Sequence, residues 1–220
     1  MGVAAAVARS LVVVTGLGLW FWTQGLIGKR RPPRGTIDDG LHALTAPLNA
    51  WLQANRPWAD IMLIVTSGLI DAFGIYLIVA TVAGPTLRPF LGLFLLFALR
   101  QACQAIVSLP APRGMIWHRP PVPSLLVTYG VATDLFFSGH TAIAVYGACE
   151  LARLGLPALT FAAVAVATLE ACTVIVLRAH YTMDVFAAVF AALVAAGVAP
   201  ALAAPCDAWL ARTVALVTGS

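Results

Sequence analysis

The sequence predicts an all-α fold: an integral-membrane bundle of six helices, with an amphipathic helix at the membrane surface between the first two spans. Of 220 residues, 61% are hydrophobic and only 10% are charged. Soluble domains carry about 25% charged residues, so a water-soluble fold is not expected. The apolar residues also gather in six runs, and about 20 such residues cross a bilayer core as a helix. Within a single domain of residues 1–220, the runs cover residues 11–27, 61–83, 87–109, 138–154, 158–177 and 181–203.

The segment after the first run differs from the spans in polarity. That run ends in the basic sequence GKRRPPRG, whose charges require headgroups or water. Residues 36–58 are too polar to cross a bilayer, but Leu41, Leu44, Leu48 and Leu52 recur at helical spacing. We therefore expect the amphipathic helix here, lying in the membrane interface.

A proline-rich segment separates the third run from the fourth. The prolines of LPAPRGMIWHRPPVPS cannot continue a helix, so residues 110–137 form a loop. With six spans, this loop, the 28–60 segment and the 177–181 turn lie on the same side of the membrane. His140 opens the fourth run and His180 precedes the sixth. The two histidines are therefore expected at the same face.

These histidines carry the candidate chemistry. Histidine titrates near neutral pH, which suits proton transfer and nucleophilic attack. Asp184 follows His180 by four residues, so the two side chains share a helix face. A carboxylate there can hold one ring nitrogen protonated and leave the other free to attack. His140, from another helix, could protonate a leaving oxygen, and Ser138 beside it offers a hydroxyl donor.

Charged residues near the histidines suggest a phosphate substrate. Arg100 lies within the third run and Arg178 two residues before His180, and guanidinium groups bind phosphate through paired hydrogen bonds. The structural alternative pairs Arg100 with Asp71 or Glu170 inside the bundle.

The role of Asp134 stays open between two alternatives, because it could orient a histidine or cap the fourth helix.

No metal and no cofactor is expected. The net charge of +4 includes no long basic stripe, so a nucleic-acid partner is not expected either.

The two histidine motifs, SGHT and HYTMDV, resemble the sphingomyelin synthase-type branch of the type 2 phosphatidic acid phosphatase (PAP2) superfamily. LRQACQAIVSLPAP, LFFSGH and the arginine before HYT are similar to the phosphatidylcholine:diacylglycerol cholinephosphotransferases. The resemblance covers about residues 30–200 and implies a metal-free six-helix membrane fold. It also implies that His180 attacks phosphorus, Asp184 supports it and His140 protonates the departing lipid alcohol.

Three departures separate this chain from the water-using lipid phosphatases of the same superfamily. Their Lys-x6-Arg-Pro signature is missing, Phe137 replaces the proline before SGH, and Val174 replaces an arginine six residues before His180. The pattern favours transfer of a phospho-headgroup from a phospholipid to diacylglycerol or ceramide. The alternatives are a lipid phosphate phosphatase or phosphodiester hydrolase, and a catalytically silent lipid-binding or transport protein.

We expect a multi-pass protein of the endoplasmic reticulum or of a bacterial inner membrane. Basic residues are more numerous on the histidine face, which predicts a cytoplasmic site. The resemblance implies a luminal or periplasmic site instead, so the sequence leaves the orientation and the oligomeric state open.

Overall fold

The computed structural model describes residues 2–29, 35–120, 124–127, 129 and 135–218. Within these residues the fold is entirely helical, with eight helices and no strand. The helices are α1 (Val3–Ile27), α2 (Gly40–Leu44), α3 (Ala46–Ala54), α4 (Arg56–Val82), α5 (Arg88–Ile106), α6 (Gly139–Ala152), α7 (Pro157–Val176) and α8 (Thr182–Thr218). Asp134 lies outside the described residues.

Five helices in the described part of the chain are long and apolar enough to cross a membrane: α1, α4, α5, α7 and α8. Even α5, with 19 residues, is about 28 Å long at 1.5 Å per residue, close to the thickness of a bilayer core. The protein is therefore a multi-pass membrane protein. Helix α6 has only 14 residues, or about 21 Å, which is shorter than the expected 138–154 span.

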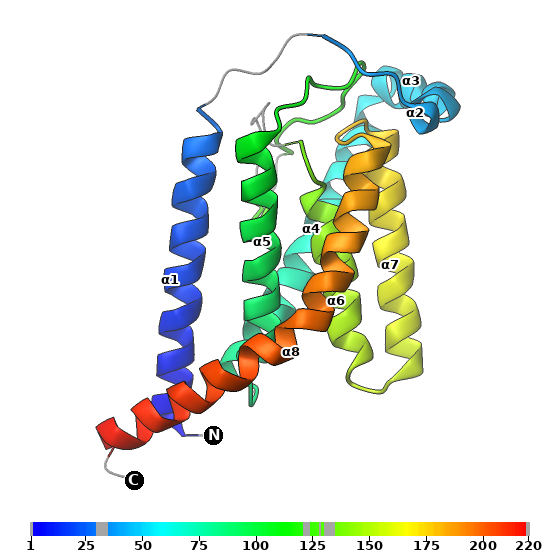
Figure 1. Cartoon of the computed structure of the whole chain (residues 1–220). Helices are drawn as coiled ribbons and strands as arrows, with labels where there is room; N and C mark the ends of the chain where they lie inside the picture. The colour runs from blue at the N-terminus through cyan, green and yellow to red at the C-terminus, as the bar shows by residue number, and fades with distance from the viewer. Residues whose placement is uncertain (1, 30–34, 121–123, 128, 130–134, 219–220) are drawn as a thin grey trace.

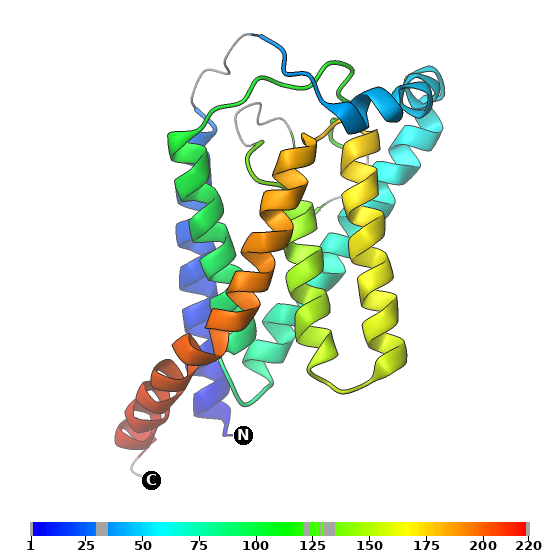
Figure 2. The same cartoon turned by 45° about the vertical axis from the view of Figure 1, so that its right-hand side comes forward.

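The long helices and α6 run side by side, while α2 and α3 lie across one end (Figure 1). Turning the molecule by 45° shows the same arrangement (Figure 2). Helix α6 packs against α4, α5, α7 and α8, whereas α1 packs against α4, α5 and α8 at the edge. Helix α6, which carries His140 in its first turn, therefore lies between other helices.

Small residues allow this close packing around α6. One face of α8 is buried through Ala188, Ala192, Ala195 and Ala199, and short side chains let membrane helices approach closely. On α5, a Cβ atom built on Gly92 would meet the Tyr146 hydroxyl oxygen at only 2.0 Å. Glycine at this position therefore keeps α5 in contact with α6.

The segment expected to form the interfacial helix folds as two short helices, α2 and α3. They meet at Thr45, just before Pro47, which has no N–H to continue α2. Leu44 and Trp51 point outward with 75% and 47% exposure, while Leu52 packs inward. The apolar outer surface fits an interfacial position, which stays a prediction.

Helix α8 differs most from its sequence-based range of 181–203, because it continues to Thr218 with Pro200 and Pro205 inside it. Pro200 has no N–H to donate to the Ala196 carbonyl, four residues earlier. The Arg153 side chain donates to that carbonyl at 2.7 Å instead. This replacement bond explains how the helix passes the proline; beyond it, the end of α8 turns away from the bundle (Figure 2).

Candidate active site

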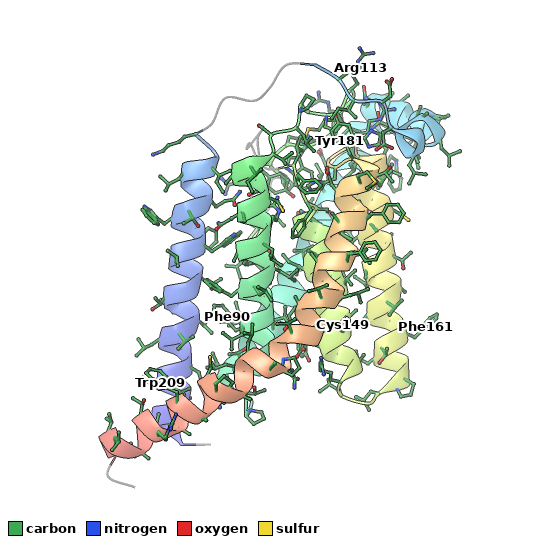
Figure 3. All side chains as sticks on the ribbon, in the orientation of Figure 1. Phe90, Arg113, Cys149, Phe161, Tyr181 and Trp209 are labelled. Atoms are coloured by element: carbon green, nitrogen blue, oxygen red, sulfur yellow. The ribbon has the colours of Figure 1, made fainter. Side chains whose placement is uncertain are left out.

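The connection between α7 and α8 places His180. This residue is only 5% exposed, and its Nδ1 lies 2.7 Å from the Leu135 carbonyl oxygen. A carbonyl only accepts hydrogen bonds, so Nδ1 carries the proton. In the neutral ring, the Nε2 lone pair is then left to attack or to accept a proton. Tyr181, the next residue, lies at the end of the bundle that carries α2 and α3 (Figure 3).

Asp184 supports this arrangement at longer range than the sequence suggests. Its Oδ2 lies 3.6 Å from His180 Nδ1, which is beyond hydrogen-bond distance. The same oxygen accepts from the Tyr181 backbone N–H at 2.8 Å and so caps the first turn of α8. Asp184 therefore acts on His180 mainly as a nearby negative charge, while the Leu135 carbonyl fixes the position of the ring proton.

His140 occupies the first turn of α6, and Ser138 is the N-cap of that helix. The Ser138 hydroxyl oxygen accepts from the Thr141 N–H at 3.3 Å and from the Thr141 hydroxyl at 3.1 Å. The Ser138 N–H donates to the Asp184 carbonyl at 3.1 Å, which joins the two histidine motifs. Ser138 is fully buried, so the described contacts give it a structural role in positioning His140.

One cavity brings the candidate residues together. Its volume is about 40 Å³, and Arg100, His140 and His180 line its polar part. Trp117 also lines it and stands edge-on to the His140 ring, with the ring centroids 5.1 Å apart. The His140 Nε2 is buried and has no hydrogen-bond partner in the described residues. The cavity thus contains a nucleophile candidate, a proton-transfer candidate and a positive charge.

Arg100 is held against the start of α6. Its Nε donates to the Phe137 carbonyl at 2.8 Å. A Cβ atom built on Gly139 would lie only 3.3 Å from that Nε, so glycine permits the close approach. The acidic residues considered as structural partners have other surroundings. Asp71 accepts from two backbone N–H groups of the 124–127 loop, and the carboxylate of Glu170 has no hydrogen-bond partner in the described residues.

Arg178 does not line this cavity. Its φ of 54° is left-handed and uncommon for a residue with a side chain. One terminal nitrogen donates to the Arg113 carbonyl, and the other donates to the His42 carbonyl at 3.2 Å. The structure thus brings Arg100 to the histidines and directs Arg178 toward the surface segment.

Helix α2 makes contacts to the turn that carries His180, and sequence reasoning missed them. The Asp39 carboxylate accepts from the Thr182 N–H at 2.7 Å and from the Thr182 hydroxyl at 2.6 Å. His42 Nε2–H donates to the His180 carbonyl at 2.9 Å. We call these contacts, together with the Arg178–His42 bond, the α2 latch. The partners lie far apart in sequence, and the only sequence signal is an aspartate at a helix start.

The pKa of Asp39 is consistent with its contacts in the α2 latch. Burial alone raises the pKa of Asp39, but the hydrogen bonds from Thr182 and His42 outweigh burial and hold the pKa below its usual value of 3.8. The carboxylate is therefore charged at neutral pH, and its two bonds from Thr182 in the latch are charge-assisted hydrogen bonds.

Comparison with known protein families identifies the relationship. The family model AtPDCT1/2, which describes phosphatidylcholine:diacylglycerol cholinephosphotransferases, matches residues 37–201, more than half of the chain. The chain belongs to this family. The matched region includes the α2 latch, Arg100, both histidines and Asp184, while α1 lies outside it. No curated protein and no solved structure showed a significant match.

Proposed function

We propose that this protein moves a phospho-headgroup, of the phosphocholine type, from a phospholipid to a lipid alcohol through a phosphohistidine on His180. The family match supports a phospholipid headgroup transferase. The observation that carries the mechanism is the bond from His180 Nδ1 to the Leu135 carbonyl. This bond leaves Nε2 as the nucleophilic nitrogen of a ring that shares a cavity with His140 and Arg100.

In the first half-reaction, His180 Nε2 attacks the phosphorus atom of the phospholipid. The bond between phosphorus and the diacylglycerol oxygen breaks, and His140 gives its proton to that oxygen. Asp184, 3.6 Å from Nδ1, stabilises the positive charge that develops on the His180 ring. The positive charge of Arg100 offsets the negative charge on the non-bridging phosphate oxygens.

In the second half-reaction, the hydroxyl oxygen of a diacylglycerol or ceramide attacks the same phosphorus atom. The phosphorus–nitrogen bond breaks, His180 is released, and His140 takes the proton of the attacking hydroxyl. The two steps together exchange one lipid alcohol for another, without net gain or loss of protons. Neither step needs a metal ion or a cofactor.

The six-span topology is part of the same proposal. In it, the short helix α6 is the fourth of the six crossings. A shorter helix is tolerated there because α4, α5, α7 and α8 surround it. Both histidines then lie near one membrane face, within reach of lipid headgroups. The PAP2-type relationship of the fold is supported by the SGHT and HYTMDV motifs.

The test uses the purified full-length protein in detergent, with phosphatidylcholine labelled in its choline group and unlabelled diacylglycerol as acceptor. We expect label in newly formed phosphatidylcholine, and the His180→Ala and His140→Ala variants to lose at least a thousandfold of the rate. A labelled intermediate on the wild-type protein that is absent from His180→Ala would support the phosphohistidine.

His118→Ala provides the matched control. His118 lies 2.6 Å from Asp60, and its side chain is 42% exposed, so it is a histidine outside the cavity. We expect this variant to keep the wild-type rate. Release of free phosphocholine in place of transfer would show hydrolysis and contradict the proposal. A His180→Ala variant as active as wild type would remove His180 from the mechanism.

A further inference from the structure

Trp20 of α1 forms part of the wall of the catalytic cavity. Its side chain is 4% exposed and lines the same cavity as Arg100, His140 and His180. The indole stacks on Phe97 of α5, with the ring centroids 4.3 Å apart and the planes 14° from parallel. The stacking fixes the plane of the indole ring relative to α5.

Hydrogen bonds hold α1 and α5 together next to this pair. Gln101 Nε2 donates to the Trp20 carbonyl at 3.0 Å, and the Thr23 hydroxyl donates to Gln101 Oε1 at 2.8 Å. The backbone of Trp20 and its ring are therefore both held by α5. The ring is thus a fixed part of the cavity wall.

The indole N–H of Trp20 lacks an acceptor. The Nε1 atom is buried and has no hydrogen-bond partner in the described part of the chain. Buried tryptophan N–H groups usually have a partner, because an unmade hydrogen bond in an apolar site is costly. A bound molecule that supplies an oxygen in the cavity would satisfy this donor.

The depth of Trp20 indicates which oxygen this could be. Phe97 precedes Arg100 by three residues on α5, or about 4.5 Å along the helix axis. Since α5 runs toward the end that carries the histidines, Phe97 and the stacked Trp20 lie farther into the bundle than the backbone of Arg100, whose Nε binds the Phe137 carbonyl just before α6. When the phosphate of a glycerophospholipid is at Arg100 and the histidines, its ester carbonyls lie in the direction of the tails. They are the first acceptors met at that depth.

We infer that the Trp20 indole N–H donates a hydrogen bond to an ester carbonyl of the diacylglycerol moiety, which phosphatidylcholine and diacylglycerol share. The inference rests on the proposed function for the placement of the phosphate. It assigns lipid recognition to a helix outside the family match of residues 37–201. Trp20 is in this assignment a specificity-determining residue for ester-linked lipids.

The test compares ester-linked lipids with dialkyl ether analogues, which have no carbonyl. Binding is measured in detergent on the full chain carrying His180→Ala, so that no turnover is needed. We expect this protein to bind dioleoyl phosphatidylcholine about two- to tenfold more tightly than the ether analogue, the range for one hydrogen bond. Adding Trp20→Phe removes the N–H but keeps an aromatic ring against Phe97, and should abolish the preference.

Trp22→Phe is the matched control, since Trp22 is two residues away and 64% exposed; it should keep the ester preference. The same comparison with diacylglycerol and its dialkyl analogue shows whether donor, acceptor or both use the bond. An equal ester preference with and without the Trp20 N–H would overturn the inference, as would the lack of a preference for either lipid before substitution. An ester preference in a wild-type protein that performs no transfer would uphold the inference and refute only the proposed function.

Discussion

At the scale of single residues, the two arginines near the histidines have different surroundings. Arg100 lines the cavity, whereas Arg178 donates to backbone carbonyls outside it. We predict that Arg100→Lys, which keeps the charge but loses the guanidinium donors, lowers the transfer rate about tenfold to a hundredfold. Arg178→Lys should cost less than tenfold, because an ammonium group can still donate to a carbonyl. The measurement is kcat for labelled headgroup transfer, and a larger loss for Arg178→Lys would contradict these assignments.

Residue types and spacing were sufficient to select His140, His180, Asp184 and Arg100 as candidates. They could not place Arg178, because its side-chain direction depends on a left-handed backbone conformation and on carbonyls of remote segments. Trp20 was missed for another reason. A tryptophan in an apolar run has the same sequence pattern whether it is exposed on the outside of the bundle, as Trp22 is, or lines a cavity.

At the scale of secondary-structure elements, the α2 latch connects a surface helix to the turn that carries His180, the proposed nucleophile. Asp39→Ala removes the acceptors for the Thr182 N–H and hydroxyl at the start of α8, and the cap of α2. We predict a fall in kcat of roughly tenfold or more, because small displacements of a catalytic group are costly. Asp38→Ala is the control, since Asp38 is exposed and adjacent, and should leave kcat unchanged. Equal effects of the two substitutions on kcat would show that the latch does not position His180.

The latch also has a predictable pH dependence. The folded-state pKa of Asp39 lies below its usual value of 3.8, so the carboxylate stabilises the fold above that pH. This contribution should disappear as the pH falls through the lowered folded-state pKa. Thermal unfolding in detergent should therefore show Asp39→Asn less stable than wild type at pH 6, with the difference shrinking below about pH 4. A difference that persists unchanged at pH 3 would contradict this account.

The apolar runs predicted where the helices lie, but they did not always predict where the helices end. Pro47 divides the expected interfacial helix into α2 and α3, while Pro200 leaves α8 continuous. The difference lies in the partners, because Arg153 donates to the Ala196 carbonyl that Pro200 leaves without a backbone donor. That long-range contact has no local sequence signal.

At the scale of the whole molecule, two clusters of polar groups lie at opposite ends of the bundle. The cavity and the α2 latch occupy one end. Near the other end, Glu150 of α6 is 1% exposed and pairs with Arg88 at 3.0 Å and with Arg153 at 3.1 Å. Glu150 follows His140 by ten residues on the same helix, or about 15 Å. A substitution at Glu150 should therefore change the stability of the fold without changing the chemistry at the histidines.

We predict that Glu150→Ala destabilises the protein but spares its chemistry. Removing one partner of a buried ion pair costs about 3–5 kcal/mol. Here we expect a loss of about 2–3 kcal/mol. Arg88 and Arg153 are partly exposed, so water can solvate their charges once Glu150 is removed. The transfer rate per folded molecule should stay within about twofold of wild type, since Glu150 does not line the cavity and lies about 15 Å along α6 from His140. Arg212→Gln, an exposed charge removal on α8, should change neither quantity. Unfolding in detergent and labelled headgroup transfer are measured in parallel for both variants. A kcat that falls together with stability in Glu150→Ala would show that the two ends act as one coupled unit.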